Sequence, residues 1–207
     1  EMNDDQREYF LNYATSPDGN MYALPVFADE GDYFNYNVAA WINTSWLDFL
    51  NLEMPATTDE YYDVLKAFRD QDPNGNGKAD EIPLIGGAPG GGVYKGDVTL
   101  MLLNAFTYYN DSNNLNVKDG KLYAPFATDE YREGLIYITK LTSENLLSPL
   151  TFSLTDYKEL SAMLAIDPSQ PSYVGSFCTG ITAHSFGMIP NEKILEYDAL
   201  PVLEGPE

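Results

Sequence analysis

The stretch from Trp41 to Leu84, WINTSWLDFLNLEMPATTDEYYDVLKAFRDQDPNGNGKADEIPL, decides the fold. Asn43-Thr-Ser-Trp46 is typical of a helix cap and predicts a short helix that ends near Asn51. Thr57 followed three residues later by Glu60 is the pattern of a capping box, which predicts a second helix over 59–69. A polar loop at 70–81 and a brief apolar strand at 82–85 follow. Helix and strand signals therefore alternate within 44 residues.

Outward from this stretch, the alternation continues in both directions. The segment 118–123 predicts a hairpin with Asp119-Gly120 as its turn. Apolar side chains at helical spacing predict a buried face on the 59–69 helix, and they predict a second, long amphipathic helix over 128–145. These residues are Tyr62, Leu65 and Phe68 in the first helix, and Tyr131, Leu135, Ile138 and Leu141 in the second. Further helices are predicted at 3–14, 98–109 and 154–164, and further strands at 21–25, 32–43 and 173–182. This order predicts an α/β fold with helices around a short mixed sheet.

The loop Asp72-Pro-Asn-Gly-Asn-Gly-Lys-Ala-Asp-Glu81 carries the strongest chemical signal. Oxygen-bearing side chains alternate along it, a glycine occupies the sixth place, and the residue at the seventh place offers a backbone carbonyl, as in a calcium loop. The twelfth place, where glutamate is usual, holds Pro83, so Glu81 would supply its carboxylate two residues early. The alternative is an Asn/Gly-rich turn without metal, but three facing carboxylates would repel one another without a cation. We therefore predict a structural calcium site formed by Asp72, Asn74, Asn76, Lys78, Asp80 and Glu81.

Composition narrows the classes of partner. Eleven basic and thirty-two acidic residues give a formal net charge of −21, which disfavours binding to nucleic acid or directly to an anionic membrane surface. The single cysteine, Cys178, allows no internal disulfide, and it lies in an apolar stretch typical of a buried, inert thiol. No run of 18 apolar residues and no signal peptide is present. We expect the chain to be an internal piece of a longer protein.

Several blocks of sequence together resemble a known family. They are Trp41 to Asp48, Met54 to Glu60 and Val64 to Arg69, which run into the metal loop and Ile82-Pro-Leu84. Further matches are Asp18 to Pro25, Asp129 to Leu135, Leu146 to Phe152 and Leu200 to Pro206. The ordered string is similar to the family 1 extracellular solute-binding proteins, in the lipoprotein branch common in Gram-positive bacteria. One departure is Asn51, where relatives usually have glycine.

The resemblance implies a type II periplasmic-binding fold, in which two α/β lobes close on a ligand at a hinge. Residues 1–207 would form a single lobe, the second, with segments 1–27 and 200–207 close to the hinge. The first lobe, the lipid-anchoring cysteine and a C-terminal part would lie outside this chain. The resemblance further implies a carbohydrate ligand, ABC permease subunits as partners, a cell-surface location, and membrane association only through that lipid anchor. Similar relatives hold calcium in the matching loop.

The segment 29–36 mixes aromatic and acidic side chains just after the first crossing segment. Aromatic rings stack on sugar faces and carboxylates bind sugar hydroxyls, so we predict Glu30, Asp32, Tyr33 and Tyr36 as ligand-binding residues. The alternative is that these rings alternate between core and solvated edge. Tyr94 is a further candidate, just beyond the glycine-rich loop 86–92, which fits neither nucleotide-binding pattern. The Tyr108-Tyr109 pair is more typical of packing.

Catalysis is not predicted. His184 is the only histidine, and no nucleophile-elbow motif accompanies it. No sequence feature selects a carboxylate pair of the kind that glycosidases use. The predicted function is therefore recognition and delivery of a carbohydrate, most typically an oligosaccharide. The alternatives are a calcium-dependent surface adhesion module without a transport partner, and a glycoside-active enzyme.

Overall fold

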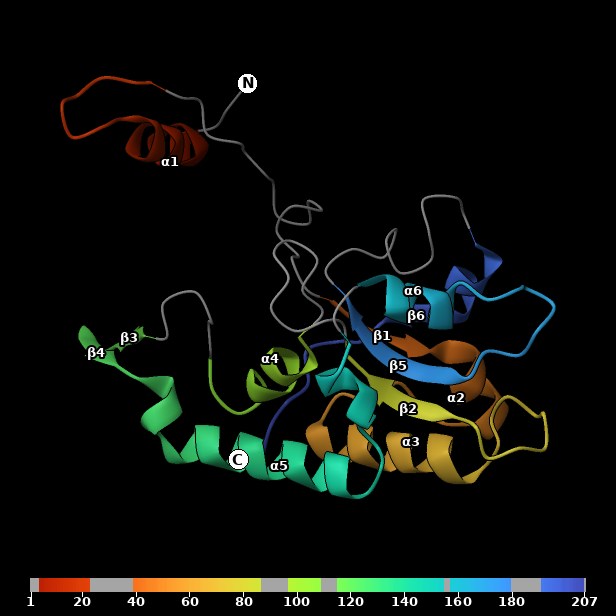
Figure 1. Ribbon diagram of the computed structural model, residues 1–207. Coiled ribbons are helices and arrows are strands. Elements are labelled where there is room, and N and C mark those ends of the chain that lie inside the picture. Colours follow the sequence, from red (N-terminus) through yellow and green to blue (C-terminus); the bar gives the residue numbers. More distant parts are fainter. Residues whose placement is uncertain are drawn as a thin grey trace. The chain divides into compact units, whose positions relative to one another are not determined.

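A computed structural model describes residues 4–22, 39–86, 97–108, 115–154, 157–179 and 191–206 (Figure 1). The chain divides into two compact units, Glu1–Tyr36 and Asn37–Glu207, each of which is described by itself. The expectation of a single lobe with hinge-proximal segments at 1–27 and 200–207 stays a prediction. No helix in the described part of the chain is long and apolar enough to cross a membrane.

The first unit contains helix α1, Asp4–Ala14, as the sequence predicts for 3–14. The predicted turn follows, in which the Gly19 amide donates to the Ser16 carbonyl at 2.8 Å. Gly19 has a φ of 81°, which a residue without a side chain adopts at little cost. The strand predicted at 21–25 is seen only as an isolated bridge between Thr15 and Met21, and residues 23–25 lie outside the described part.

The second unit is built on a four-stranded sheet of order β2-β5-β1-β6. Its strands are β1 Ala39–Asn43, β2 Ile82–Ile85, β5 Val174–Thr179 and β6 Tyr197–Ala199. β2 runs parallel to β5, whereas β1 is antiparallel to both β5 and β6, so the sheet is mixed, as expected. All six residues of β5 are buried, including the polar residues Ser176 and Thr179, as expected for a central strand that is covered on both faces. β6 was not predicted.

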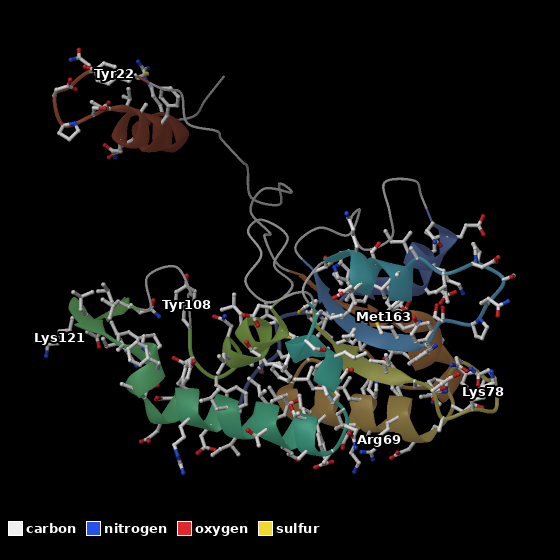
Figure 2. All side chains as sticks on the ribbon, in the orientation of Figure 1. Tyr22, Arg69, Lys78, Tyr108, Lys121 and Met163 are labelled. Atoms are coloured by element: carbon white, nitrogen blue, oxygen red, sulfur yellow. The ribbon has the colours of Figure 1, made fainter. Side chains whose placement is uncertain are left out.

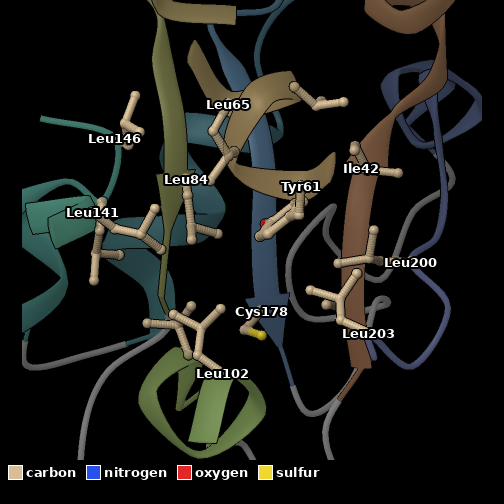
Figure 3. Close-up of a cluster of buried hydrophobic side chains, with 14 of the residues drawn as sticks. Ile42, Tyr61, Leu65, Leu84, Leu102, Leu141, Leu146, Cys178, Leu200 and Leu203 are labelled. Carbon is tan, nitrogen blue, oxygen red and sulfur yellow. The ribbon is translucent and has the colours of Figure 1, made fainter. Parts of the chain in front are cut away.

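Helices cover both faces of this sheet (Figure 1). They are α2 Thr44–Leu50, α3 Thr58–Asp70, α4 Val98–Leu103, α5 Asp129–Ser143 and α6 Tyr157–Leu164. Single 3₁₀ turns lie at Pro125–Ala127, Pro149–Phe152 and Glu192–Glu196. Alternate strand residues point to opposite faces, so Leu84 and Cys178 join one core while Ile85 and Phe177 join another. The larger core brings α3, α4 and α5 against the sheet (Figure 3), and the smaller one contains Leu160 and Leu164 of α6.

The predicted caps are confirmed. The Asn43 side chain accepts a hydrogen bond from the Trp46 amide at 3.0 Å and begins α2, and Asn51 ends it in the left-handed conformation. Thr57 and Glu60 form the capping box of α3, with bonds of 3.2 and 3.1 Å. Both helices therefore begin where the sequence places them.

Three details of the predicted helices are wrong. α4 ends at Leu103 rather than Tyr109, because the chain turns there. In α3, Tyr61 is fully buried, and Tyr62 lies at the edge. In α5, Leu135 is 45% exposed, and the face is built on Gly134, Tyr137, Ile138 and Leu141. Gly134 is needed because a Cβ there would lie 2.9 Å from the Leu103 side chain of α4.

The predicted hairpin is confirmed. β3 Asn116–Lys118 pairs antiparallel with β4 Lys121–Tyr123. Asp119 and Gly120 both have positive φ, at 52° and 72°, which is the conformation of a tight hairpin turn.

Candidate metal loop and ligand-binding edge

Measured along the strands, the sheet has two opposite ends, which we call edges, and the strand register shows which residues lie at each of them. Ala39 is paired with Thr179, and Gly86 directly follows the paired residue Ile85, so these three residues lie at one edge. We call it the carboxyl edge, because the parallel strands β2 and β5 both end there. The opposite edge, which we call the loop edge, contains Asn43 at the end of β1 and Ile82 at the start of β2. In open α/β sheets, ligands bind outside the carboxyl ends of the strands.

All five predicted ligand-binding residues belong to segments that join the sheet at the carboxyl edge. Glu30, Asp32, Tyr33 and Tyr36 precede Ala39, and Tyr94 lies in the segment that connects Gly86 to Asp97. The five residues themselves lie outside the described part of the chain, as does His184. The topology thus connects both groups to a single edge although more than 50 residues separate Tyr36 from Tyr94. Their role stays a prediction.

Described residues fix the points at which these segments leave and return. The Gly86 amide donates to the Thr151 hydroxyl at 3.0 Å, which holds the end of β2. Asp97 caps α4 by accepting from the Thr99 amide at 2.9 Å and the Leu100 amide at 3.3 Å. Cys178 is fully buried at this edge, and burial, together with the negative charge of Asp97, raises the pKa of its thiol. The prediction of a buried thiol is confirmed, and a protonated buried thiol is a poor nucleophile.

The metal loop lies at the loop edge, between the end of α3 and the start of β2, and Figure 2 shows Lys78 on it. Asp72 begins the loop with a φ of 46°, and Gly75 and Gly77 also have positive φ, at 66° and 74°. The two carboxylate oxygens of Asp72 accept the backbone amides of Asn76 and Gly77, at 3.1 and 2.9 Å. This winding directs the alternate side chains inward, as the spacing predicts.

Asn74, Asn76 and Asp80 meet inside the loop. The side-chain amides of Asn74 and Asn76 both donate to Asp80 Oδ1, at 3.4 and 3.0 Å. The Asn76 side-chain oxygen accepts the Lys78 amide at 2.8 Å. To present oxygen to a cation, each asparagine amide would have to turn, and its oxygen would give up the bond that it accepts from the backbone amide of Asn76 or Lys78.

Glu81 is the residue that most favours a cation. Its Oε1 is buried and has no hydrogen-bond partner among the described residues. Burial raises the pKa of this carboxyl, and the charges of Asp80 and Asp72 raise it further. A desolvated carboxylate held near two others is unfavourable unless a positive charge compensates it.

The donor set fits a hard cation better than a transition metal. No three histidine, cysteine, aspartate or glutamate side chains converge within the described ranges, so carboxylates alone do not form a site. The expectation that three carboxylates face one another is thus not met in the described residues, where Asp80 instead contacts the side-chain amides of Asn74 and Asn76. A site here would mix carboxylate, amide and backbone oxygens, which is the chemistry that calcium prefers.

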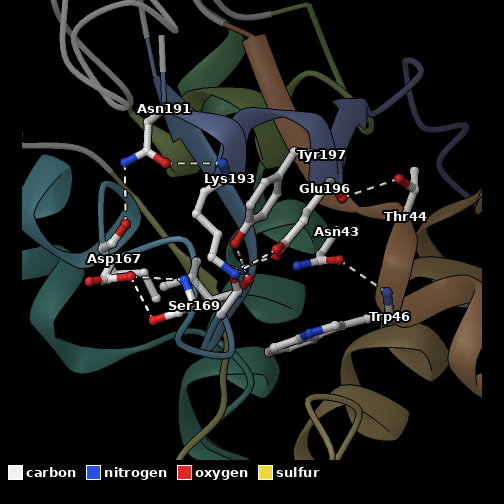
Figure 4. Close-up of polar contacts among 12 residues, drawn as sticks. Asn43, Thr44, Trp46, Asp167, Ser169, Asn191, Lys193, Glu196 and Tyr197 are labelled. Carbon is white, nitrogen blue, oxygen red and sulfur yellow. Dashed lines mark hydrogen bonds and ion pairs between the residues drawn. The ribbon is translucent and has the colours of Figure 1, made fainter. Parts of the chain in front are cut away.

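A second polar cluster at the loop edge was not predicted (Figure 4). Lys193, only 5% exposed, donates from Nζ to Glu196 Oε1 at 2.6 Å, and the Ser172 hydroxyl donates to Glu196 Oε2 at 2.6 Å. The Tyr197 hydroxyl donates to the Val174 carbonyl at 2.6 Å. Next to this cluster, the Ile82 amide donates to the Tyr173 carbonyl at 2.7 Å. The cluster therefore holds the start of β5. β5 in turn pairs with β2, the strand that the metal loop enters at Ile82. The spacing of Lys193 and Glu196, three residues apart, was the available signal in the sequence.

Tyr108 differs from its predicted packing role. It is 65% exposed beyond the end of α4 (Figure 2), and Tyr109 lies outside the described part.

No protein-family model matches the chain.

Comparison with known proteins finds strong similarity over nearly the whole chain. It is 35% identical to the fructooligosaccharide ABC transporter substrate-binding protein FusA of Streptococcus pneumoniae serotype 4, over 98% of this chain and 36% of that protein. A solved FusA structure in complex with kestose is 34% identical, with a TM-score of 0.71 over 98% of this chain and 39% of that chain. A further FusA structure, an EF-hand mutant in complex with fructo-nystose, is 34% identical, with a TM-score of 0.70 over 98% of this chain and 39% of that chain.

Two other relatives extend the comparison. An HMO-binding ABC-transporter-associated solute-binding protein from Bifidobacterium longum infantis is 29% identical, with a TM-score of 0.75 over 98% of this chain and 40% of that chain. Lipoprotein LipO of Bacillus subtilis is 37% identical over 111 residues, 52% of this chain and 20% of that protein. The predicted fold class is confirmed. The chain spans 36–40% of the length of FusA and the Bifidobacterium protein.

Proposed function

Because this chain belongs to the extracellular solute-binding proteins of carbohydrate ABC transporters, we propose that it binds an oligosaccharide and delivers it to a membrane permease. Two observations support an oligosaccharide rather than a single sugar. FusA carries fructooligosaccharide in its name, and its solved complexes hold kestose and fructo-nystose. The location that we propose is the outer surface of a Gram-positive cell, with a lipid anchor outside the present chain.

The arrangement of the carboxyl edge carries this proposal. In the sequence, the aromatic and acidic segment 29–36 precedes β1, which begins at this edge, and Tyr94 falls between β2, which ends there, and α4. Flat rings and carboxylates are the groups that recognise sugar faces and hydroxyls. Closure of the first lobe, which would lie outside this chain, over this edge would remove the bound sugar from water. The closed form would then dock on the permease.

We further propose that the loop 72–81 holds a structural calcium ion. Asp72, Asn74, Asn76, Asp80 and Glu81 would supply side-chain oxygens, and Lys78 its backbone carbonyl. When bound, the ion would neutralise the carboxylates and fix the connection between α3 and β2. The loop edge is the far end of the sheet from the proposed sugar site, so the ion would act on stability rather than on recognition. The FusA EF-hand mutant that holds fructo-nystose supports this separation.

Binding without catalysis is also part of the proposal. FusA and the Bifidobacterium relative are named as binding proteins, and the buried Cys178 thiol is unsuited to nucleophilic attack. The alternative of an adhesion module would bind sugar without lobe closure and without a permease.

A thermal-shift screen of the complete mature protein tests the proposal. The protein is incubated with a panel of oligosaccharides, its melting temperature is followed, and each sugar is then checked for cleavage. We expect a rise of several degrees with one sugar class and no products, since a ligand that binds only the native state stabilises it. Products would assign the protein to the enzymes, and the absence of any shift would refute carbohydrate binding.

A further inference from the structure

The metal loop contains two asparagine-glycine pairs, Asn74-Gly75 and Asn76-Gly77, and no other asparagine in the sequence precedes a glycine. Because glycine has no side chain, its amide nitrogen can approach the side-chain amide of the preceding asparagine without a steric barrier. Both glycines are exposed, and a Cβ built at either would meet no atom of the described residues within 4 Å. Water therefore reaches both pairs.

The chemistry open to such a pair is spontaneous deamidation, and asparagine is accordingly a thermolabile residue. The glycine nitrogen bonds to the side-chain carbonyl carbon of the asparagine, the bond from that carbon to the side-chain nitrogen breaks, and this nitrogen leaves with the glycine's proton as ammonia. Water then opens the five-membered imide. Cleavage at the side-chain carbon gives aspartate, and cleavage at the main-chain carbon gives isoaspartate, in which the backbone runs through the side chain. The one co-reactant is water.

The structure holds the two glycine nitrogens differently. The Gly75 amide donates to the Asp72 carbonyl at 3.0 Å, which is a neutral acceptor. The Gly77 amide donates to the Asp72 carboxylate at 2.9 Å. A hydrogen bond to an ionised acceptor is roughly twice as strong. Because the nitrogen must give up this bond and its proton before it attacks, the carboxylate protects the second pair more than the carbonyl protects the first.

The asparagine side chains differ in the same direction. Each accepts from the backbone amide two residues ahead, at 3.0 Å for Asn74 and 2.8 Å for Asn76. Each donates to Asp80, at 3.4 Å from Asn74 and 3.0 Å from Asn76, and the longer contact exceeds an ordinary N–H···O bond. Asn74 is therefore held more loosely and turns more readily toward the glycine that follows it.

We propose that Asn74 is a site of spontaneous deamidation when no cation is bound, and that it reacts before Asn76. The reaction replaces an amide that donates to Asp80 by a carboxylate that repels it. Aspartate adds a charged oxygen to the donor set, whereas isoaspartate lengthens the backbone by one carbon and shifts the later oxygens out of their alternate spacing. The affinity of the loop for a cation therefore changes as the protein ages, and this consequence alone rests on the calcium proposed above.

Peptide mapping by mass spectrometry tests the proposal. The complete mature protein is incubated in EDTA at mildly alkaline pH, both native and in urea, and fragmentation of its peptides distinguishes aspartate from isoaspartate. In the native protein we expect Asn74 to react about fivefold faster than Asn76, because a charged hydrogen bond stabilises more than a neutral one. In urea the two rates should be similar, since the hydrogen bonds of the loop are lost.

The variant Asp72→Asn tests the cause of this ranking. It removes the charge that holds the Gly77 amide, so Asn76 should now react at about the same rate as Asn74. The introduced side chain cannot react in the same way, because the next residue, Pro73, has no amide proton.

The matched control is Asp70→Asn, which also removes one charge beside the loop and should keep the wild-type ratio of rates. Two results in the wild type would overturn the proposal. One is native Asn74 that stays intact over a time in which it is largely converted in urea, and the other is native Asn76 that reacts as fast as Asn74 or faster. A melting temperature that is the same in EDTA and in calcium refutes the calcium site instead, and it leaves the deamidation rates unaffected.

Discussion

The substitution Glu81→Gln should have opposite effects with and without calcium. In a chelator, the change removes a partly desolvated negative charge that Asp80 and Asp72 repel, and whose Oε1 has no hydrogen-bond partner in the part of the chain that the structure describes. The chelated variant should therefore melt at the same temperature as the chelated wild type, or higher. In calcium, the same change removes a carboxylate ligand, so the variant should gain less from the ion.

The size of the calcium effect follows from mass action. Extracellular calcium sites with a Kd of about 10⁻⁴ to 10⁻⁵ M, at roughly 1 mM calcium, add about 1.4 to 2.7 kcal/mol to the free energy of unfolding. For a chain of 207 residues, this corresponds to a rise in melting temperature of roughly 3–10 °C. At the same calcium concentration, a site that is tenfold weaker adds about 1.0 to 1.3 kcal/mol less, which removes roughly half to seven-tenths of that rise.

Differential scanning calorimetry in EDTA and in calcium measures both effects. Asp70→Asn is the matched control, because Asp70 adjoins the loop but is bonded to Arg69 at 2.7 Å and is not a predicted ligand. The control should keep the full calcium increment. A wild-type protein whose melting temperature is the same in EDTA and in calcium would show that the loop is merely a turn. An unaltered increment in Glu81→Gln would remove Glu81 from the ligand set.

Four further predictions concern other parts of the chain. Chelation should leave the sugar Kd unchanged at 25 °C, well below the melting temperature, as titration calorimetry in EDTA and in calcium will show. Tyr36→Ala should weaken sugar binding about tenfold or more, as loss of a stacked ring would, while Tyr108→Ala should leave it unchanged. Cys178 should not react with a thiol reagent in the native protein but should react once per chain in denaturant, because it is fully buried. Gly175→Ala should lower the free energy of unfolding by about 1–3 kcal/mol in urea titrations, since its Cβ would lie 2.4 Å from the Phe68 ring.

Local signals in the sequence were enough to place several elements. Asn43 and the pair Thr57 and Glu60 fix where α2 and α3 begin, because a cap is decided by side chains within three residues of the backbone groups that they satisfy. Asp119-Gly120 fixes the hairpin for the same reason, since both residues tolerate positive φ. Features of this kind do not depend on the rest of the fold.

Features decided by packing were harder to predict. In α5, the buried stripe contains Gly134, which adds no apolar area and lies where Leu103 at the end of α4 and Phe106 just beyond it approach closely. In α3, adjacent tyrosines are equivalent in the sequence. Tyr61 is buried with its hydroxyl 2.7 Å from the Ser176 hydroxyl, whereas the ring of Tyr62 lies under Lys140. Both outcomes depend on residues far along the chain.

The site divides in the same way. The metal loop is contiguous, so its spacing alone could place its oxygens, and the structure brings Asn74, Asn76 and Asp80 into contact. The ion pair of buried Lys193 and half-buried Glu196 was missed because its partner Ser172 comes from another segment. The common attachment of the segments containing Tyr36 and Tyr94 became visible only through strand pairing.

The strand directions show how the two proposed functions could share one small sheet. A parallel pair places both of its strand ends at one edge, and the antiparallel neighbour β1 begins at that same edge, so three connections open there. Those connections can vary in sequence to suit a ligand without altering a single pair in the sheet. The loop before β2 opens at the other edge, where it sets the spacing between α3 and the sheet. A cation there would hold the scaffold on which the carboxyl edge depends, without touching the sugar.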